Sequence, residues 1–230
     1  MKALAVGLAL ALPLPAAADC RLALALAMDV SRSVDRADFA IQTEGLALAL
    51  EDRAVQQAFF APAGEVALAV YQWSGETHQE LLVDWVVVRS PADLAAVAAV
   101  MRRARQPERR QLTALGEALA FGQALVARAP DCGRVVIDVA GDGQNNQGRA
   151  PRHVYAAGGW QGITVNALAI RAHELGLIVY FHDHLIHGPG AFVEVAESQA
   201  DFPRAIRRKL IRELTEAVAA LANPPQRRKS

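Results

Sequence analysis

The sequence predicts an α/β fold in which a doubly wound, mostly parallel β-sheet carries helices on both faces and has one antiparallel edge strand. Short apolar segments of strand length alternate with segments whose apolar residues recur at helical spacing, a pattern typical of strands joined by covering helices. Only one link between successive strands, 74–79, is short enough for a hairpin, so the strand after it is the expected antiparallel edge. Hydrophobic residues make up 53% of the chain and charged residues 21%, which allows a buried core and excludes a disordered chain.

The predicted strands are largely continuous apolar runs, as expected for strands that helices bury on both faces. They are 21–28, 66–73, 80–88, 134–139, 163–170 and 191–195. The third of them, 80–88, is also enriched in β-branched and aromatic residues, which pack well on a pleated sheet.

The predicted helices lie between these strands and after the last one. They are 34–50, 91–103, 113–128, 151–157, 173–185 and 203–221. Pro91 begins the second helix, where its fixed φ angle is tolerated. The last helix is amphipathic: Ile206, Leu210 and Leu214 are expected to face the core. The basic stretch of Arg207, Arg208 and Lys209 is interpreted as its solvated face.

Residues 1–18 have the layout of a secretory signal peptide. Lys2 precedes the apolar run 3–12, and a proline-broken stretch then leads to the small residues 16–18, which suit a cleavage site. A cleaved signal predicts a periplasmic or secreted protein. The alternative is a buried N-terminal strand or helix.

The remainder of the chain is interpreted as one domain, residues 19–222, followed by a polar tail, residues 223–230. No segment after the signal is long and apolar enough for a membrane span. Lys and Arg number 24, as do Asp and Glu, and this zero net charge gives no support to a nucleic-acid partner. Two cysteines are too few for a disulfide-built scaffold or a four-thiolate metal site.

Oxygen-bearing side chains gather where strands of the predicted sheet end or where a helix begins. Asp29, Ser31 and Ser33 follow the first strand, Asp142 follows the fourth strand, and Thr113 opens a helix. In doubly wound sheets, ligands bind beyond the carboxyl ends of the strands, near the point where the strand order reverses. Hydroxyl and carboxylate oxygens are hard donors, which suit Mg²⁺, Mn²⁺ or Ca²⁺ rather than zinc or copper. These residues are therefore a candidate site for a divalent cation.

A plainer interpretation is that Ser31 and Ser33 cap the following helix and that Asp142 only forms a turn. Capping accounts for one of these residues but not for the whole set. Arg32, between the two serines, either faces an incoming anion or is simply solvated. The stretch 141–146 is not a dinucleotide-binding loop, because the third glycine of that motif is absent.

These residues resemble the von Willebrand factor type A domain and its metal-ion-dependent adhesion site. The similarity rests on D-x-S-x-S at 29–33, T-x-L-G-x-A-L at 113–119 and D-G at 142–143, in the order of that family. It implies a Rossmann-like type A fold in which these residues hold a divalent cation. It also implies that one coordination position stays open for a carboxylate from a partner protein.

Within that family the chain is most similar to the bacterial DUF1194 group. The shared features are Cys20, V-A-G-D-G-Q-N-N at 139–146, G-P-G-A-F at 188–192 and I-R-R-K-L at 206–210. In the type A arrangement the first and fourth strands are parallel neighbours, and Cys20 and Cys132 precede Asp29 and Asp142 by nine and ten residues. The resemblance therefore implies a Cys20–Cys132 disulfide at the end of the sheet opposite the metal, which an oxidising compartment favours.

Three histidines, His182, His184 and His187, form a second candidate cluster. On a helix, His184 and His187 share a face while His182 points away from it. A solvated polar face is the preferred interpretation, and a second, histidine-bound metal is the alternative. No pair of nucleophile and base stands out, and the G-x-S-x-G motif is absent.

We therefore expect an exported, metal-ion-dependent protein-binding module, not an enzyme, in which an acidic residue of a protein partner docks through the cation. The alternative is a hydrolase that uses the same metal as a Lewis acid, although no general base is evident in the three loops. A third possibility is a domain that scaffolds without metal. The sequence does not indicate the oligomeric state.

Overall fold

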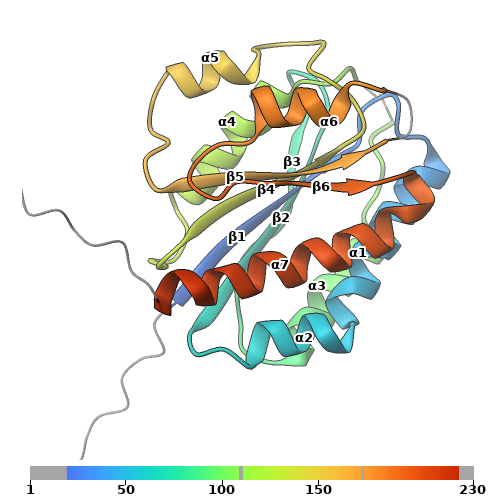
Figure 1. The fold of residues 1–230 in the computed structure, drawn as a ribbon. Coiled ribbons are helices and arrows are strands. Elements are labelled where there is room, and N and C mark those ends of the chain that lie inside the picture. Colours follow the sequence, from blue (N-terminus) through green and yellow to red (C-terminus); the bar gives the residue numbers. More distant parts are fainter. Residues whose placement is uncertain (1–19, 109–110, 172–173, 223–230) are drawn as a thin grey trace, which may run out of the picture.

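The computed structural model describes residues 20–108, 111–171 and 174–222 (Figure 1). The predicted signal peptide, residues 1–18, and the predicted polar tail, residues 223–230, lie outside the described residues. Among the helices that the structure describes, none is long and apolar enough to cross a membrane.

The described residues form a six-stranded sheet with the order β3-β2-β1-β4-β5-β6. The strands are β1 (Cys20–Asp29), β2 (Glu65–Trp73), β3 (Gln79–Val88), β4 (Val135–Gly141), β5 (Ile163–Ile170) and β6 (Val193–Ala196). Only the edge strand β3 is antiparallel to its neighbour; the other pairs are parallel. The predicted fold class and the predicted antiparallel edge are confirmed.

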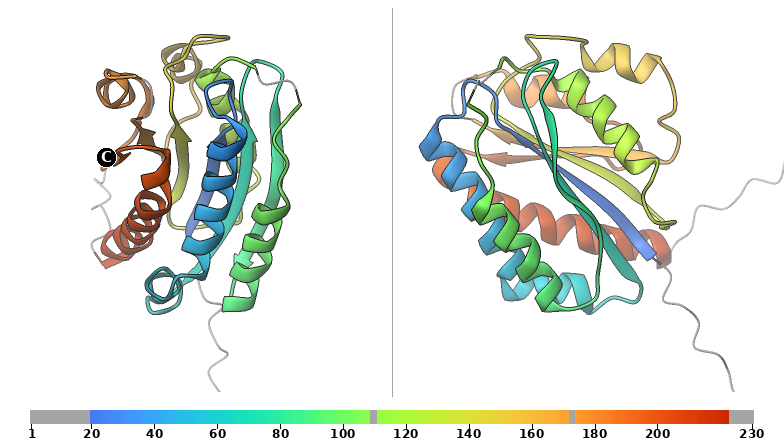
Figure 2. Two further views of the ribbon diagram at one scale, coloured as in Figure 1. Left: turned by 90° about the vertical axis from the view of Figure 1, so that its right-hand side faces the viewer. Right: turned by 180° about the vertical axis from the view of Figure 1, so that it is seen from behind.

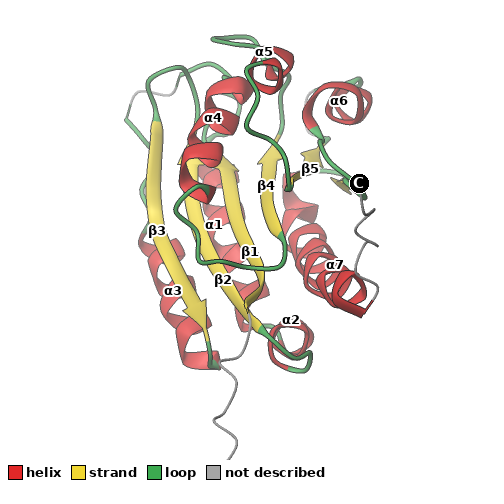
Figure 3. Ribbon diagram, turned by 90° about the vertical axis from the view of Figure 1, so that its left-hand side faces the viewer, coloured by secondary structure: helices red, strands yellow, loops and turns green. Residues whose placement is uncertain are grey.

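Helices cover both faces of the sheet (Figures 2 and 3). One face carries α1 (Arg36–Glu51), α2 (Arg53–Phe60), α3 (Pro91–Arg103) and α7 (Phe202–Ala222), and the other carries α4 (Leu115–Val126), α5 (Pro151–Ala156) and α6 (Leu177–Tyr180). The central strand β1 serves both layers because its side chains alternate between the two faces. Leu24 and Leu26 pack toward α1 and α7, whereas Ala25 and Ala27 allow α4 to approach closely.

Two helical segments differ from the prediction. Helix α2 was not anticipated; Asp52 both ends α1 and caps α2 by accepting hydrogen bonds from the backbone N–H groups of Ala54 and Val55. The helix predicted over 173–185 begins later, after Gly176, and ends at Leu185 as predicted, but its last turn, Phe181–Leu185, is π-helical. Neither boundary has a strong sequence signal, since a single aspartate and a single glycine set them.

Lys209 is fully buried, so the prediction that it lies on a solvated helix face is wrong. Its ammonium group lies 3.0 Å from Glu213 Oε1 and 3.1 Å from Asp138 Oδ1. The three residues predicted to face the core, Ile206, Leu210 and Leu214, are buried. Lys209 joins them because buried carboxylates from its own helix and from β4 compensate its charge.

A disulfide joins Cys20 at the start of β1 to Cys132 just before β4, with their Cα atoms 4.5 Å apart. The predicted bridge is therefore present. Because β1 and β4 are parallel, with Ala23 opposite Val135, the bridge lies at the end of the sheet away from the carboxyl ends of these strands.

Candidate metal centre

The carboxyl ends of β1 and β4 bring the two predicted aspartates to one edge of the sheet. Asp29 is the last residue of β1, and Asp142 follows Gly141, the last residue of β4. The parallel register pairs Met28 with Ala140, so both carboxyl groups emerge side by side. The strand order also reverses between β1 and β4, which is where doubly wound sheets bind ligands.

Hydroxyl groups complete this cluster. Ser31 Oγ lies 3.2 Å from Ser33 Oγ, and Thr113 Oγ1 donates to Ser31 Oγ across 3.4 Å. Ser33 Oγ donates to Asp142 Oδ1 at 2.5 Å, and the backbone N–H of Ser31 donates to Asp29 Oδ1 at 2.7 Å. The structure thus brings together the five residues that the sequence nominated.

The helix-capping interpretation of the two serines does not hold. Asp35 is the residue that caps α1: its Oδ1 accepts from the backbone N–H groups of Ala37, at 2.7 Å, and Asp38, at 2.9 Å. Ser31 and Ser33 instead direct their hydroxyls toward the other oxygen atoms of the cluster.

The loop carrying Thr113 is fastened to the loop after β4. Asn146 Oδ1 accepts from the backbone N–H of Thr113 at 2.8 Å, and the Thr113 carbonyl accepts from the N–H groups of Asn146 and Gln147. Asn145 Oδ1 accepts from the N–H of Gly116 at the start of α4. The two asparagines therefore fix the position of Thr113 relative to Asp142.

The two carboxyl groups are buried, with Asp29 0% and Asp142 1% exposed. Burial, together with the charge of the neighbouring Asp142, raises the pKa of Asp29 to about 8. Asp29 Oδ2 has no hydrogen-bond partner among the residues that the structure describes. An unsatisfied buried oxygen beside a second carboxylate and three hydroxyls fits a hard divalent cation, which would compensate the charge and coordinate that oxygen.

A cavity of about 280 Å³ opens over the cluster. Its lining consists of Arg32, Ser33, Leu112, Thr113, Asp142, Gly143, Asn146 and Glu174. Glu174 was not nominated from the sequence because no motif surrounds it. Its Oε2 accepts from the backbone N–H of Gln144 at 3.0 Å, which places a further carboxylate at the rim.

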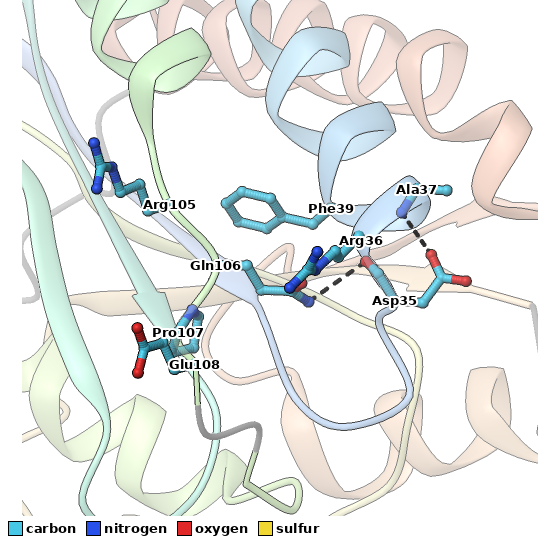
Figure 4. Close-up of a pocket in the computed structure, with 8 residues that line it drawn as sticks. All are labelled: Asp35, Arg36, Ala37, Phe39, Arg105, Gln106, Pro107 and Glu108. Carbon is cyan, nitrogen blue, oxygen red and sulfur yellow. Dashed lines mark hydrogen bonds between the residues drawn. The ribbon is translucent and has the colours of Figure 1, made fainter.

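A larger cavity, of about 890 Å³, adjoins the loop that follows β1. The start of α1 and the segment after α3 line it through Asp35, Arg36, Ala37, Phe39, Arg105, Gln106, Pro107 and Glu108 (Figure 4). Gln106 joins the two sides by donating to the carbonyls of Val34 at 2.8 Å and Asp35 at 3.4 Å. This cavity holds no nominated metal ligand.

The three histidines contact different groups. His182 lies 3.1 Å from Asp183, the His184 ring packs near Tyr180, and the His187 ring stacks on Tyr155 with centroids 4.7 Å apart. Within the described residues, no group of three or more His, Cys, Asp or Glu side chains is arranged to hold a metal ion. The oxygen cluster is a different kind of site, because three of its five residues contribute hydroxyl groups.

The strand order and the helices on both faces of the sheet match the fold of von Willebrand factor type A domains. The chain belongs to the family described as "Protein of unknown function (DUF1194)", which matches residues 19–218. Both predicted resemblances are confirmed. No curated protein matches the chain.

Solved structures share the fold at low sequence identity. Proximal thread matrix protein 1 from the mussel byssus, with a zinc-occupied MIDAS motif, has a TM-score of 0.61 and 17% identity, covering 87% of this chain and 47% of that one. A von Willebrand factor type A protein from Catenulispora acidiphila has a TM-score of 0.56 and 13% identity, covering 87% and 43%. The pilus adhesin SpaC from Lactobacillus rhamnosus GG has a TM-score of 0.58 and 12% identity, covering 86% and 30%. The chain thus spans about half the length of the byssus protein and less than half the length of the other two proteins.

Proposed function

We propose that this protein is an exported module that binds a protein partner through a divalent cation. The observation that carries the proposal is the convergence of the buried carboxyl groups of Asp29 and Asp142 with three hydroxyls, with one carboxylate oxygen left unsatisfied. The fold supports it, because the similar structures include a pilus adhesin and a byssus matrix protein whose MIDAS motif holds zinc.

The ion would be held by Asp29, Ser31, Ser33, Thr113 and Asp142. Hydroxyl ligands carry no charge, so the ion, whether Mg²⁺, Mn²⁺ or Ca²⁺, would keep much of its positive charge and act as an electrostatic anchor for an anion. The 280 Å³ cavity, lined by Ser33, Thr113 and Asp142, admits a side chain from outside. An acidic residue of a protein partner is therefore the proposed docking group.

Export is proposed from two features. The first is the signal-like segment 1–18, and the second is the Cys20–Cys132 disulfide, because such bonds persist in oxidising compartments. Cleavage would leave one domain, residues 19–222, with the tail 223–230, in the periplasm or outside the cell.

The groups around the candidate metal centre favour a binding function over hydrolysis. No histidine is among the described residues that line the cavity, and the Glu174 carboxylate at its rim already accepts a backbone hydrogen bond. A hydrolase needs a general base within reach of an attacking water.

The test is ion binding followed by partner capture. Calorimetry with Mg²⁺, Mn²⁺ and Ca²⁺ is expected to detect binding by the unmodified protein and none by Asp29→Ala, while Asp183→Ala, which removes an exposed carboxylate, binds normally. Capture of envelope proteins is expected to be lost with chelator and with Asp29→Ala. A well-folded protein that binds none of these ions contradicts the proposal. Ester or phosphate hydrolysis that is lost in Asp29→Ala supports the hydrolase instead.

A further inference from the structure

Two buried glutamines lead from helix α1 to the candidate metal centre. Gln42 lies on α1 and is 1% exposed, and Gln199 begins the short 3₁₀ turn Gln199–Asp201 before α7 and is 7% exposed. Gln42 Nε2 donates to Gln199 Oε1 at 3.1 Å, and Gln199 Nε2 donates to Asp142 Oδ2 at 3.3 Å. We call Gln42 and Gln199 the amide pair.

The amide pair supports the second oxygen of the Asp142 carboxylate. Ser33 Oγ donates to Oδ1 from the loop that follows β1, and Gln199 Nε2 donates to Oδ2 from the segment before α7. Two donors on two different oxygens fix both the position and the rotation of a carboxylate. The Gln42 bond to Gln199 Oε1 keeps the nitrogen of that amide directed at Asp142, because a glutamine side chain donates only through its nitrogen.

The chemistry of this contact suits a metal ligand. A lysine or arginine at position 199 would neutralise Asp142, whereas an amide donates a hydrogen bond and leaves the negative charge available to a cation. Burying two amides is unfavourable unless they are hydrogen-bonded, and an apolar pair would fill the same space without that requirement.

The close approach of two helices brings the amide pair together. Gly45 lies one turn beyond Gln42 on α1, and a Cβ atom at this position would lie 3.0 Å from Pro203 Cγ and 3.1 Å from Phe202 Cδ1. The absence of a side chain at Gly45 therefore lets the start of α7 pack directly on α1. That packing places Gln199 within reach of both Gln42 and Asp142.

We propose that Gln199 is a positioning residue of the metal centre, which holds the Asp142 carboxylate for the cation, and that Gln42 orients the Gln199 amide. This proposal rests on the proposed metal-binding function and deepens it. It makes ion affinity depend on two residues that would not themselves touch the ion.

The test compares the ion affinities of methionine variants, which keep the side-chain volume and lose the amide, with that of an asparagine variant, which keeps the amide on a shorter side chain. Gln199→Met is expected to weaken Mg²⁺ and Mn²⁺ binding by roughly 10- to 100-fold in calorimetry, the usual effect of removing a partner of a metal ligand. Gln42→Met is expected to weaken binding less, because Gln199 can still donate. The double variant should bind as weakly as Gln199→Met alone, since the two residues act through one hydrogen bond to Asp142. Gln199→Asn, one methylene shorter, provides a second variant that retains polarity and should also bind weakly.

The matched control is Gln72→Met. Gln72 is also a buried glutamine, on β2, and donates to Glu80 Oε2 at 2.6 Å and to the Arg105 carbonyl at 3.3 Å. The Gln72→Met variant should have a lower unfolding temperature and an unchanged ion affinity. This outcome distinguishes loss of a positioning contact at the metal centre from a general loss of stability. If Gln199→Met and Gln199→Asn bind ions as the unmodified protein does, the positioning role is overturned and the proposed function stands. If the unmodified protein binds no ion, both are overturned.

Discussion

Lys209 on α7 lies 3.1 Å from Asp138 on β4, and neither side chain reaches solvent. The same ammonium donates to Glu213 one helical turn later at 3.0 Å. Glu213 Oε1 also accepts from Asn166 Nδ2 on β5, and Asn166 Oδ1 accepts from the backbone N–H of Phe192 before β6. This buried cluster therefore ties α7 to the half of the sheet that carries Asp142.

Replacing Lys209 with methionine is expected to destabilise the protein strongly. The substitution keeps the volume of the side chain but leaves the buried carboxyls of Asp138 and Glu213 without their cation. Removing one partner of a buried ion pair costs about 3–5 kcal/mol, measured as the loss in free energy of unfolding in urea. The control is Arg208→Met on the same helix, whose exposed ion pair with Glu194 is worth at most about 1 kcal/mol. Equal losses in the two variants would contradict a structural role for the buried charge.

The same cluster predicts a pH dependence of stability. The pKa of Asp138 is raised to about 7, mainly by burial; the charge of Lys209 opposes this increase, and the carboxylates of Glu213 and Glu194 contribute to it. A carboxyl whose folded pKa exceeds its unfolded value stabilises the fold below about pH 4, and this contribution is lost as the pH rises through about 7. The loss amounts to at most about 1.4 kcal/mol per pH unit within that window.

Urea unfolding between pH 4 and pH 8 measures this effect. Asp138→Asn cannot titrate, so its free energy of unfolding should change less over that range than that of the unmodified protein. Parallel pH profiles for the two proteins would rule out the raised pKa.

Loss of the Cys20–Cys132 disulfide is expected to lower stability without affecting the metal centre. The bridge joins residues 112 positions apart, and closing a loop of that length is worth about 4–5 kcal/mol in the chain-entropy description. The unfolding temperature of the oxidised protein should fall when reductant is added. The variant in which both cysteines are replaced by serine should unfold at this lower temperature whether or not reductant is present. Ion affinity should stay the same, because the bridge lies at the opposite end of β1. An oxidised protein that is insensitive to reductant would refute this prediction.

A methyl group at Gly141 is expected to weaken ion binding. A Cβ atom there would lie 3.1 Å from Asp29 Oδ2, the unsatisfied oxygen of the candidate metal centre, and must displace that buried carboxylate by a few tenths of an ångström. Calorimetry on Gly141→Ala should give roughly tenfold weaker Mg²⁺ binding, at the low end of effects on metal-ligand geometry. Gly176→Ala is the control, because a Cβ atom there would have its nearest contact at 3.6 Å, to Gln144 Nε2, and would touch no proposed ligand; it should bind normally. Identical ion affinities in the two variants would show that Asp29 Oδ2 is not a ligand of the ion.

Sequence reasoning located the candidate metal centre because its ligands follow chain-local rules. Asp29 ends one parallel strand and Asp142 directly follows another, and D-x-S-x-S and T-x-L-G are short motifs. Gln199 and Glu174 were not predicted from the sequence, because each reaches the candidate metal centre from a distant segment and no motif surrounds it. The helix over 53–60 was not predicted either, because its eight residues are fewer than the length at which apolar spacing identifies a helix.

The sequence by itself determined the alternation of strands and helices apart from α2, the antiparallel edge, the family and the oxygen-rich edge of the sheet, because periodicity and short motifs depend on neighbouring residues. Only the tertiary structure decided which polar residues are buried. Lys209 was predicted on a solvated helix face, and no motif in the sequence singles out Gln42 or Gln199. Each is buried because a partner from a distant segment compensates its charge or accepts its hydrogen bond. The cost of burying a polar group depends on that partner, and the partner's position is fixed only when the two layers of helices close over the sheet.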